Sequence, residues 1–269
     1  MERSRAALVM LQCVALLALV GWGTAVWASV ANKRPEVANY AGVEVVPELA
    51  VIPDSAVIPD STVIPDSAVI PDSTVRPPVI AKPVSISARM DPTWLDTVST
   101  RIGIPRRALA AYAGAASALA EHVPGCHLGW NTLAAIGHIE SDDGRHGGAV
   151  MSDNGYSTVP IIGPKLDGGA FAGIHDSDQG VWDGATVWDR AVGPFQFLPQ
   201  TWRTRGADRD GDGQADPNQM DDAALTAARY LCHAGDLSTV DGWRRAVLSY
   251  NHSESYVDDV AKLSNSYRS

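Results

Sequence analysis

The sequence predicts a mainly α-helical domain over residues 89–269, preceded by an N-terminal hydrophobic helix and a disordered repeat linker. Start and stop signals for helices bracket several apolar-periodic segments after residue 90. No run in this part alternates apolar and polar residues over a sustained length, as a half-buried strand would. The segment has about 180 residues, which fits one domain.

Residues 1–31 are expected to form the hydrophobic helix. Arg3 and Arg5 precede an uncharged run from Ala6 to Ala31, which at helical rise spans about 39 Å, more than the ~30 Å of a bilayer core. This length favours an uncleaved membrane anchor, whereas Val26-Trp27-Ala28 would suit cleavage of a signal peptide. Both alternatives export the rest of the chain, so we expect it in the cell envelope, either membrane-anchored or secreted.

Residues 32–88 are expected to form a Pro-rich linker. The hexapeptides VIPDSA and VIPDST alternate twice over residues 51–74. A six-residue period is too short for helical repeat units, and one proline per unit disfavours a central strand. We therefore expect an extended, partly polyproline-like tether, with a hexapeptide β-helix as the alternative.

The helices of residues 89–269 follow from their boundary residues. Asp91 and Pro92 open the first segment and Gly103 ends it, which is the usual order of an N-cap, a first-turn proline and a C-terminal glycine. Residues 145–190 are rich in Gly and Asp and are too long for an ordinary connection, so we expect a functional loop region there. The expected helical segments are 91–103, 104–123, 131–141, 192–206, 221–235, 241–253 and 253–267.

Charge and cysteine content restrict the partners and the compartment. The net charge is −10 and no basic stripe interleaves with aromatic residues, which disfavours binding to nucleic acid and other polyanions. Beyond the hydrophobic run only Cys126 and Cys232 remain, and an even number in an exported chain predicts a disulfide between them. Two buried free thiols are the alternative, and the spacing excludes a cysteine metal site.

Glu140 is the first candidate for chemistry. It follows Leu133, Ile136 and Gly137 on one helical face that is otherwise apolar or small. An ionised carboxylate on such a face is costly, so we expect the pKa of Glu140 to be raised, which would let it donate a proton near neutral pH. Alternatively, the side chain reaches solvent at the helix end or pairs with Arg145.

Two further clusters carry polar groups next to aromatic or apolar residues. Gln196 lies between two phenylalanines, which would suit a sugar site, or the stretch is an ordinary loop-to-helix junction. Tyr250 and Asn251 follow an apolar stretch; a buried tyrosine hydroxyl needs a partner, for which Glu140 is a candidate. The alternative is a helix end with a tyrosine at the edge of the core.

Residues 208–222 read as a calcium loop, in which a structural Ca²⁺ ion is the expected cofactor. Gln214 would offer a backbone carbonyl, and position 12 holds Gln219 instead of the bidentate Glu. Asp222, three residues further on, would close a longer loop. The alternative is an acidic, solvated turn. The remaining loop positions are Asp208, Asp210 and Asp212 at 1, 3 and 5, Gly213 at 6, and Asp216 at 9.

Four stretches in this order resemble the lytic transglycosylases of peptidoglycan, which have a lysozyme-like α fold: IGHIESDDGRHGG, WDRAVGPFQFLPQTW, DGDGQADPNQMDDAALTAARYLC and AVLSYNHSESYV. The likeness is greatest to the membrane-bound lytic transglycosylase B group, particularly its actinobacterial members, and it covers residues 90–269. It implies that Glu140 is the catalytic acid. It also implies that the next residue, Ser141, binds substrate together with Gln196, Tyr250 and Asn251. The chain has Phe195 where methionine is common.

The resemblance also implies a reaction. Glu140 would protonate the glycosidic oxygen between MurNAc and GlcNAc, the N-acetyl group would attack the anomeric carbon, and Glu140 would then act as base toward the C6 hydroxyl to form 1,6-anhydroMurNAc. Most glycosidases use two catalytic carboxylates, and the sequence indicates no second one here. A reaction in which the substrate supplies its own nucleophile therefore fits this chain. The expected partners are glycan strands, and the membrane if the N-terminal segment is uncleaved, with the protein a monomer. A lysozyme-type hydrolase and a non-catalytic wall-binding protein are the alternatives.

Overall fold

The computed structural model describes residues 85–169 and 171–268. The expectations for the hydrophobic helix and for most of the linker fall outside these residues. Within them no helix is long and apolar enough to span a bilayer. The structure confirms the mainly α-helical class. In order, the elements are η1 (Ile86–Arg89), α2 (Pro92–Ile102), α3 (Arg106–His122), α4 (Trp130–Ser141), η2 (His146–Gly148), β1 (Ile162–Lys165), β2 (Arg190–Val192), α5 (Pro199–Arg205), α6 (Met220–Cys232), α7 (Val240–Tyr250) and α8 (Glu254–Ser266).

Helix α3 lies at the centre of the core. Its alanine-rich sequence presents little side-chain bulk, and α2, α4, α6 and η1 all pack against it. At Gly114 a Cβ would lie 2.7 Å from the carbonyl oxygen of Ile86, so this glycine permits the close approach of η1. Ile86 is buried, and the packed structure therefore includes residues 85–88, which we had assigned to the linker.

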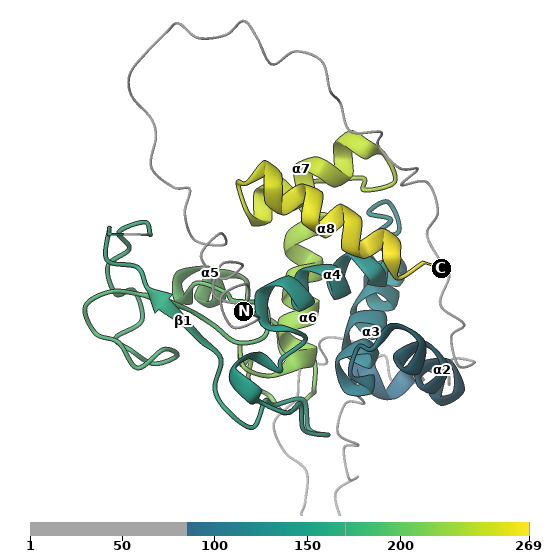
Figure 1. The fold of residues 1–269 in the computed structure, drawn as a ribbon, viewed down its shortest axis with the longest axis horizontal. Coiled ribbons are helices and arrows are strands. Elements are labelled where there is room, and N and C mark those ends of the chain that lie inside the picture. The colour runs from purple at the N-terminus through teal and green to yellow at the C-terminus, as the bar shows by residue number, and fades with distance from the viewer. Residues whose placement is uncertain (1–84, 170, 269) are drawn as a thin grey trace, which may run out of the picture.

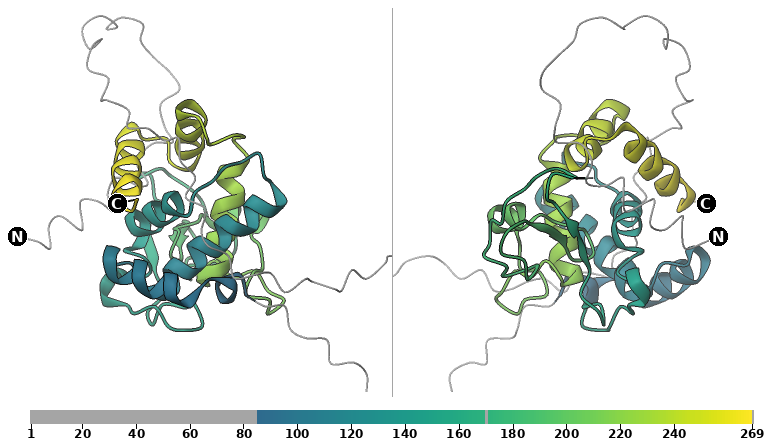
Figure 2. Two further views of the ribbon diagram at one scale, coloured as in Figure 1. Left: turned by 90° about the vertical axis from the view of Figure 1, so that its right-hand side faces the viewer. Right: turned by 60° about the vertical axis from the view of Figure 1, so that its left-hand side comes forward.

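Helices α7 and α8 lie at one end of the helical part and α2 lies toward the other (Figures 1 and 2). Helix α8 packs against α4 and α7. Ser253 caps α8 by accepting a hydrogen bond from the backbone N–H of Tyr256. This packing brings α8, the last helix described, against the end of α4 that carries Glu140.

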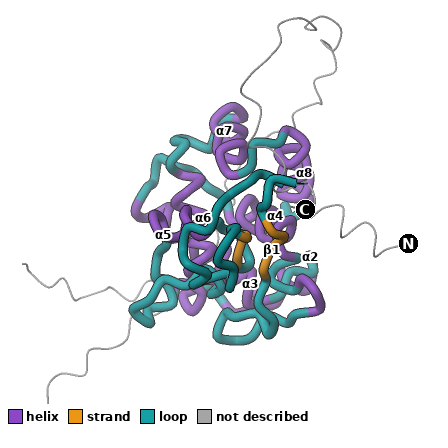
Figure 3. The backbone as a smooth tube through the Cα atoms, turned by 90° about the vertical axis from the view of Figure 1, so that its left-hand side faces the viewer, coloured by secondary structure: helices purple, strands orange, loops and turns teal. Residues whose placement is uncertain are grey.

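The region between α4 and α5 consists mainly of loops and lies to one side of the helices (Figures 1 and 3). It contains a two-stranded antiparallel sheet in which Ile162 pairs with Val192 and Lys165 pairs with Arg190. The helix expected over residues 192–206 is shorter, since α5 begins only at Pro199. Gly193 has φ +75° and Gln196 has φ +49°, and neither angle is compatible with a right-handed helix.

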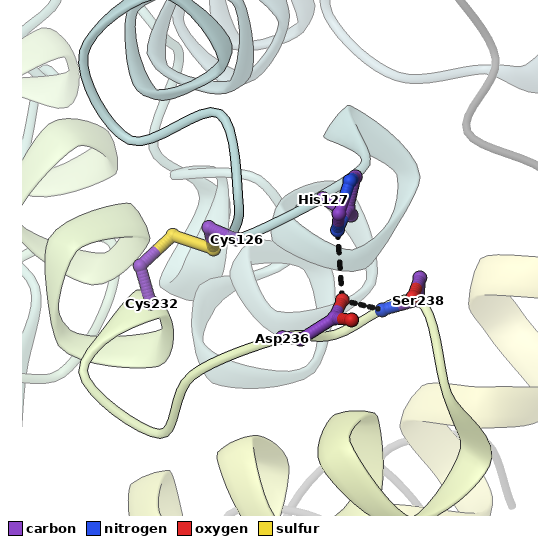
Figure 4. The surroundings of a disulfide bond; sticks show 5 residues. All are labelled: Cys126, His127, Cys232, Asp236 and Ser238. Carbon is purple, nitrogen blue, oxygen red and sulfur yellow. Dashed lines mark hydrogen bonds and ion pairs between the residues drawn. A yellow bond between two sulfur atoms is a disulfide. The ribbon is translucent and has the colours of Figure 1, made fainter.

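The disulfide between Cys126 and Cys232 is present, as expected (Figure 4). It joins the loop after α3 to the end of α6 and closes a sequence separation of 106 residues, for which chain entropy predicts a stabilisation of roughly 4–5 kcal/mol. Beside it Asp236 accepts hydrogen bonds from the backbone N–H of Ser238 and from His127, and these hold the pKa of Asp236 at about 2. The disulfide thus fixes the C-terminal end of α6. The loop of residues 208–222, called the Asp-rich loop below, lies at the other end of this helix.

Candidate functional site

Glu140 lies in the last turn of α4 and is 4% exposed. The hydroxyl of Tyr256, from α8, donates a hydrogen bond of 2.7 Å to Oε1 of Glu140, and Tyr256 is itself buried. The carboxyl group therefore remains in the interior at the helix end. Arg145 pairs with Asp142 and Asp143.

The chain leaves α4 through three successive left-handed residues. Asp142, Asp143 and Gly144 have φ values of +53°, +57° and +82°. Ser141, which is 1% exposed, accepts a hydrogen bond from the N–H of Gly144 at 2.9 Å. Its hydroxyl lies 2.7 Å from the carbonyl oxygen of Pro194, to which it can donate. Ser141 thus connects the end of α4 to the turn that contains Gln196.

A buried carboxylate stabilises this left-handed turn. Asp143 is fully buried and accepts hydrogen bonds from the hydroxyl of Tyr112 at 3.1 Å and from Arg145 at 3.3 Å. The Nδ1 atom of His138 lies 3.0 Å from the same carboxylate. This hydrogen bond raises the pKa of His138, although partial burial opposes it. Burial, together with Asp143, also raises the pKa of Tyr112.

Gln196 is half-buried in the turn between β2 and α5. Its Nε2 donates to the carbonyl oxygen of Gly193 at 2.9 Å and to that of Ile161 at 3.4 Å. A Cβ on Gly163 of β1 would lie 2.8 Å from Oε1 of Gln196, so this glycine leaves room for the amide. A Cβ on Gly193 would lie 1.8 Å from the carbonyl oxygen of Pro217, which makes glycine necessary there.

Tyr250 supports the same turn from α7. Its hydroxyl donates to the carbonyl oxygen of Phe195 at 2.7 Å, and its ring packs edge-on against Phe197. Asn251 follows as the C-cap of α7 and is half-buried. The structure therefore brings Ser141, Gln196 and Tyr250 together through the backbone of residues 194–196.

The tyrosine that bonds to Glu140 is Tyr256, and the partner expected from the sequence was Tyr250. A signal for Tyr256 does exist in the sequence. Tyr256, Val257 and Val260 form the buried stripe of α8, and a tyrosine on such a stripe needs a partner for its hydroxyl. What the sequence cannot show is which helix that stripe meets.

The Asp-rich loop brings three of its expected ligands together. Oxygen atoms of Asp208, Asp210 and Asp222 lie within 4.8 Å of one another, and such oxygen donors fit calcium. Burial raises the pKa of Asp222 to about 7. Asp212 does not belong to this group; its Oδ1 accepts the N–H of Gln214 instead, and both residues are exposed.

Gln219, at the twelfth position of the loop, does not face this group of carboxylates. It is fully buried, and its Oε1 accepts the N–H groups of Asp221 and Asp222 as the N-cap of α6. Asp222 instead closes the loop, since its carboxylate accepts backbone N–H groups from Arg209 and Asp216. This agrees with the longer loop expected from the sequence.

Comparison with known proteins identifies one family. Residues 175–240 match the transglycosylase SLT domain, a segment that includes the Gln196 turn and the Asp-rich loop but not Glu140 or Tyr250. No curated protein and no solved structure matches the chain. The match covers less than half of the chain and confirms its resemblance to the lytic transglycosylases, which act on peptidoglycan.

Proposed function

We propose that this protein is a peptidoglycan lytic transglycosylase that cleaves the β-1,4 bond between MurNAc and GlcNAc and leaves a 1,6-anhydroMurNAc end. One observation carries the proposal. Glu140 is buried under a hydrogen bond from Tyr256, and its neighbour Ser141 is joined to the turn of Gln196. That turn lies within the segment matched to the transglycosylase SLT domain.

We assign separate roles to the two oxygens of Glu140, and the hydrogen bond from Tyr256 supports this assignment. In the protonated acid, Oε1 is the carbonyl oxygen that accepts from Tyr256, and Oε2 carries the proton. Oε2 would donate this proton to the glycosidic oxygen as the bond breaks. In the same step the N-acetyl oxygen of MurNAc would attack the anomeric carbon as its bond to the glycosidic oxygen breaks. In the second step the C6 oxygen would attack the anomeric carbon, give its proton to the Glu140 carboxylate and displace the N-acetyl oxygen, which closes the 1,6-anhydro ring.

The two carboxylates adjoining Glu140 in the sequence already have other partners. Asp143 is fully buried among Tyr112, His138 and Arg145, and Asp142 pairs with Arg145. Asp143 is therefore not available to activate a water molecule as the second carboxylate of most glycosidases does, and Asp142, whose side chain is 51% exposed, is engaged in a surface ion pair. This favours participation of the substrate over a lysozyme-type hydrolysis.

The remaining motif residues divide into two groups. Ser141 is buried and bonded to backbone groups, and the hydroxyl of Tyr250 is bonded to Phe195, so we assign both to positioning of the turn. Gln196 and Asn251 are half-buried and offer amide groups for the sugar. A calcium ion held by Asp208, Asp210 and Asp222 would stabilise the loop at the start of α6, and it is assigned no part in the chemistry.

We also infer that the chain is exported. Its proposed substrate lies outside the cytoplasmic membrane, and a disulfide of this kind persists in oxidising compartments. The hydrophobic N-terminal run would supply the export signal, either as an anchor or as a cleaved leader.

The test of the proposal compares Glu140→Gln with the parent protein on purified peptidoglycan. We expect the variant to fold, with an unchanged melting temperature, and to release no soluble muropeptides. Glu121→Gln, an exposed position at the end of α3, is the control and should retain full turnover. Equal turnover by Glu140→Gln and the parent would exclude Glu140 as the acid. Binding without turnover by every version, the parent included, would favour a wall-binding protein.

A further inference from the structure

Two neighbouring cavities share Trp182 as a common wall. The larger, of about 440 Å³, is also lined by Gln179, Trp202 and Arg203. The smaller, of about 280 Å³, is also lined by Tyr156 and Pro194. The larger has the size of a small-molecule site, and both combine aromatic rings with polar side chains. None of these residues other than Pro194 takes part in the site described above.

Trp182 is held in place by the loop of residues 175–190. Its backbone N–H donates to Oδ2 of Asp178 at 2.8 Å, and its side chain is half-buried. Arg203 of α5, which also lines the larger cavity, donates to the carbonyl oxygen of Ser177 at 2.8 Å and so ties α5 to the same loop. Hydrogen bonds therefore hold two of the segments that line this cavity, the loop and α5, against each other.

One turn of backbone lines the smaller cavity and also bonds to residues of the candidate active site. Gly193 and Pro194 line it, and the carbonyl oxygen of Pro194 faces the hydroxyl of Ser141, the neighbour of Glu140. Gln196 follows two residues later and bonds back to Gly193. The turn that carries Gln196 therefore begins in the wall of the smaller cavity.

We propose that Trp182 and its two cavities form a glycan subsite, which binds N-acetylated sugar rings of the strand at a distance from the bond that is cleaved. This inference rests on the proposed function. The indole offers an apolar face to the C–H groups of a pyranose, and the surrounding hydroxyl, amide and charged groups offer donors and acceptors to its hydroxyls. Both signs of charge occur, with Arg203 and Asp178 in the larger cavity, which suits the neutral N-acetylated sugar rings.

Binding of N-acetylglucosamine oligomers of increasing length to the full chain tests this subsite directly. A Glu140→Gln background prevents cleavage, so binding is measured without turnover. We expect Trp182→Ala to weaken binding of the longer oligomers about tenfold, or about 1.4 kcal/mol, and to leave binding of the shortest unchanged. Trp182→Phe should recover part of the affinity.

Trp188→Ala is the matched control. Trp188 is a half-buried tryptophan of the same loop that stacks on His175 and lines neither cavity. We expect this variant to bind as its background does. Equal affinity of Trp182→Ala and Trp188→Ala for every oligomer would overturn the subsite. If Trp182→Ala does not fold, Arg203→Ala decides the question, because an unchanged affinity there overturns the proposal equally.

Turnover and binding are measured separately, so that failure of the subsite can be distinguished from failure of the proposed function. Turnover of peptidoglycan by the parent, with no effect of Trp182→Ala on oligomer binding, would retain the enzyme and reject the subsite. Absence of turnover in the parent would reject the enzyme, while the binding experiment still decides the subsite. An effect of Trp182→Ala confined to strands that carry peptides, and absent from strands stripped of them, would mark a peptide site and refute a glycan site.

Discussion

Tyr256→Phe is the substitution that tests the geometry around Glu140 most closely. It removes a single oxygen atom, the donor of the 2.7 Å hydrogen bond to Oε1, and retains the ring within the stripe of α8 that packs on α4. A hydrogen bond to a charged group contributes about 1.5–3 kcal/mol. If the bond orients the carboxyl group in the transition state, its loss lowers kcat by roughly 10- to 150-fold, since each 1.36 kcal/mol corresponds to tenfold.

The assay follows release of soluble muropeptides from purified peptidoglycan over a range of substrate concentrations. We expect kcat to fall and KM to change little, because Tyr256 contacts Glu140 and has no assigned contact with the sugar. The control is Tyr230→Phe, which removes a hydroxyl donated to the carbonyl oxygen of Ser249 at 3.0 Å. Both variants should lose a few degrees of melting temperature, and only Tyr256→Phe should lose activity. A wild-type kcat in Tyr256→Phe would refute the orienting role.

Three other predictions concern the surroundings of the site. Gly193→Ala should prevent folding or strongly lower the melting temperature, because a Cβ there meets a backbone oxygen at 1.8 Å, whereas Gly184→Ala, at a similar positive φ with open space, should cost only the backbone strain. His138→Gln should lower the free energy of unfolding most below about pH 6.5, and the difference from the parent should shrink as the pH rises through the raised pKa of His138. A loss of stability that does not depend on pH would contradict the ion pair. Calcium should raise the melting temperature more at about pH 8 than at about pH 6, since the pKa of Asp222 is about 7 and the ion binds the carboxylate; an unchanged melting temperature after chelation would reject the site.

Local signals in the sequence were sufficient for most of the helices. Asp91, Pro92 and Gly103 mark the ends of α2 by capping chemistry that does not depend on the rest of the fold. The apolar face that Glu140 shares on α4 indicated its burial, but the same pattern allowed a solvent-exposed side chain or an ion pair with Arg145, and the structure shows burial. The pairing of Cys126 with Cys232 followed from their number in a chain expected to be exported.

The turn before α5 could not be predicted in this way. Apolar residues at 192–198 have helical spacing, but the conformation there is set by tertiary contacts. Gly193 packs against Pro217 from the Asp-rich loop, and Tyr250 and Ser141 bind the carbonyl oxygens of residues 195 and 194. A sequence pattern reports local periodicity and carries no information on such long-range partners.

The tyrosine bound to Glu140 was missed for a similar reason. The sequence predicts Tyr250 as the partner, whereas the hydrogen bond to Oε1 comes from Tyr256, one helix later. The packing of α8 against α4 decides which tyrosine reaches the carboxyl group of Glu140 (Figure 1). The network around Asp143 was missed as well, because it depends on the three left-handed residues that follow α4.

The chemical nature of the released sugar end tests the central claim most directly. Peptidoglycan digested with the purified protein is analysed by mass spectrometry, with a reduction step that marks free reducing ends. A lytic transglycosylase leaves 1,6-anhydroMurNAc ends, which are lighter than hydrolysed ends by one water molecule and do not react with the reductant. We predict that product, with none formed by Glu140→Gln. Reducible MurNAc ends as the sole product would contradict the account and identify a hydrolase.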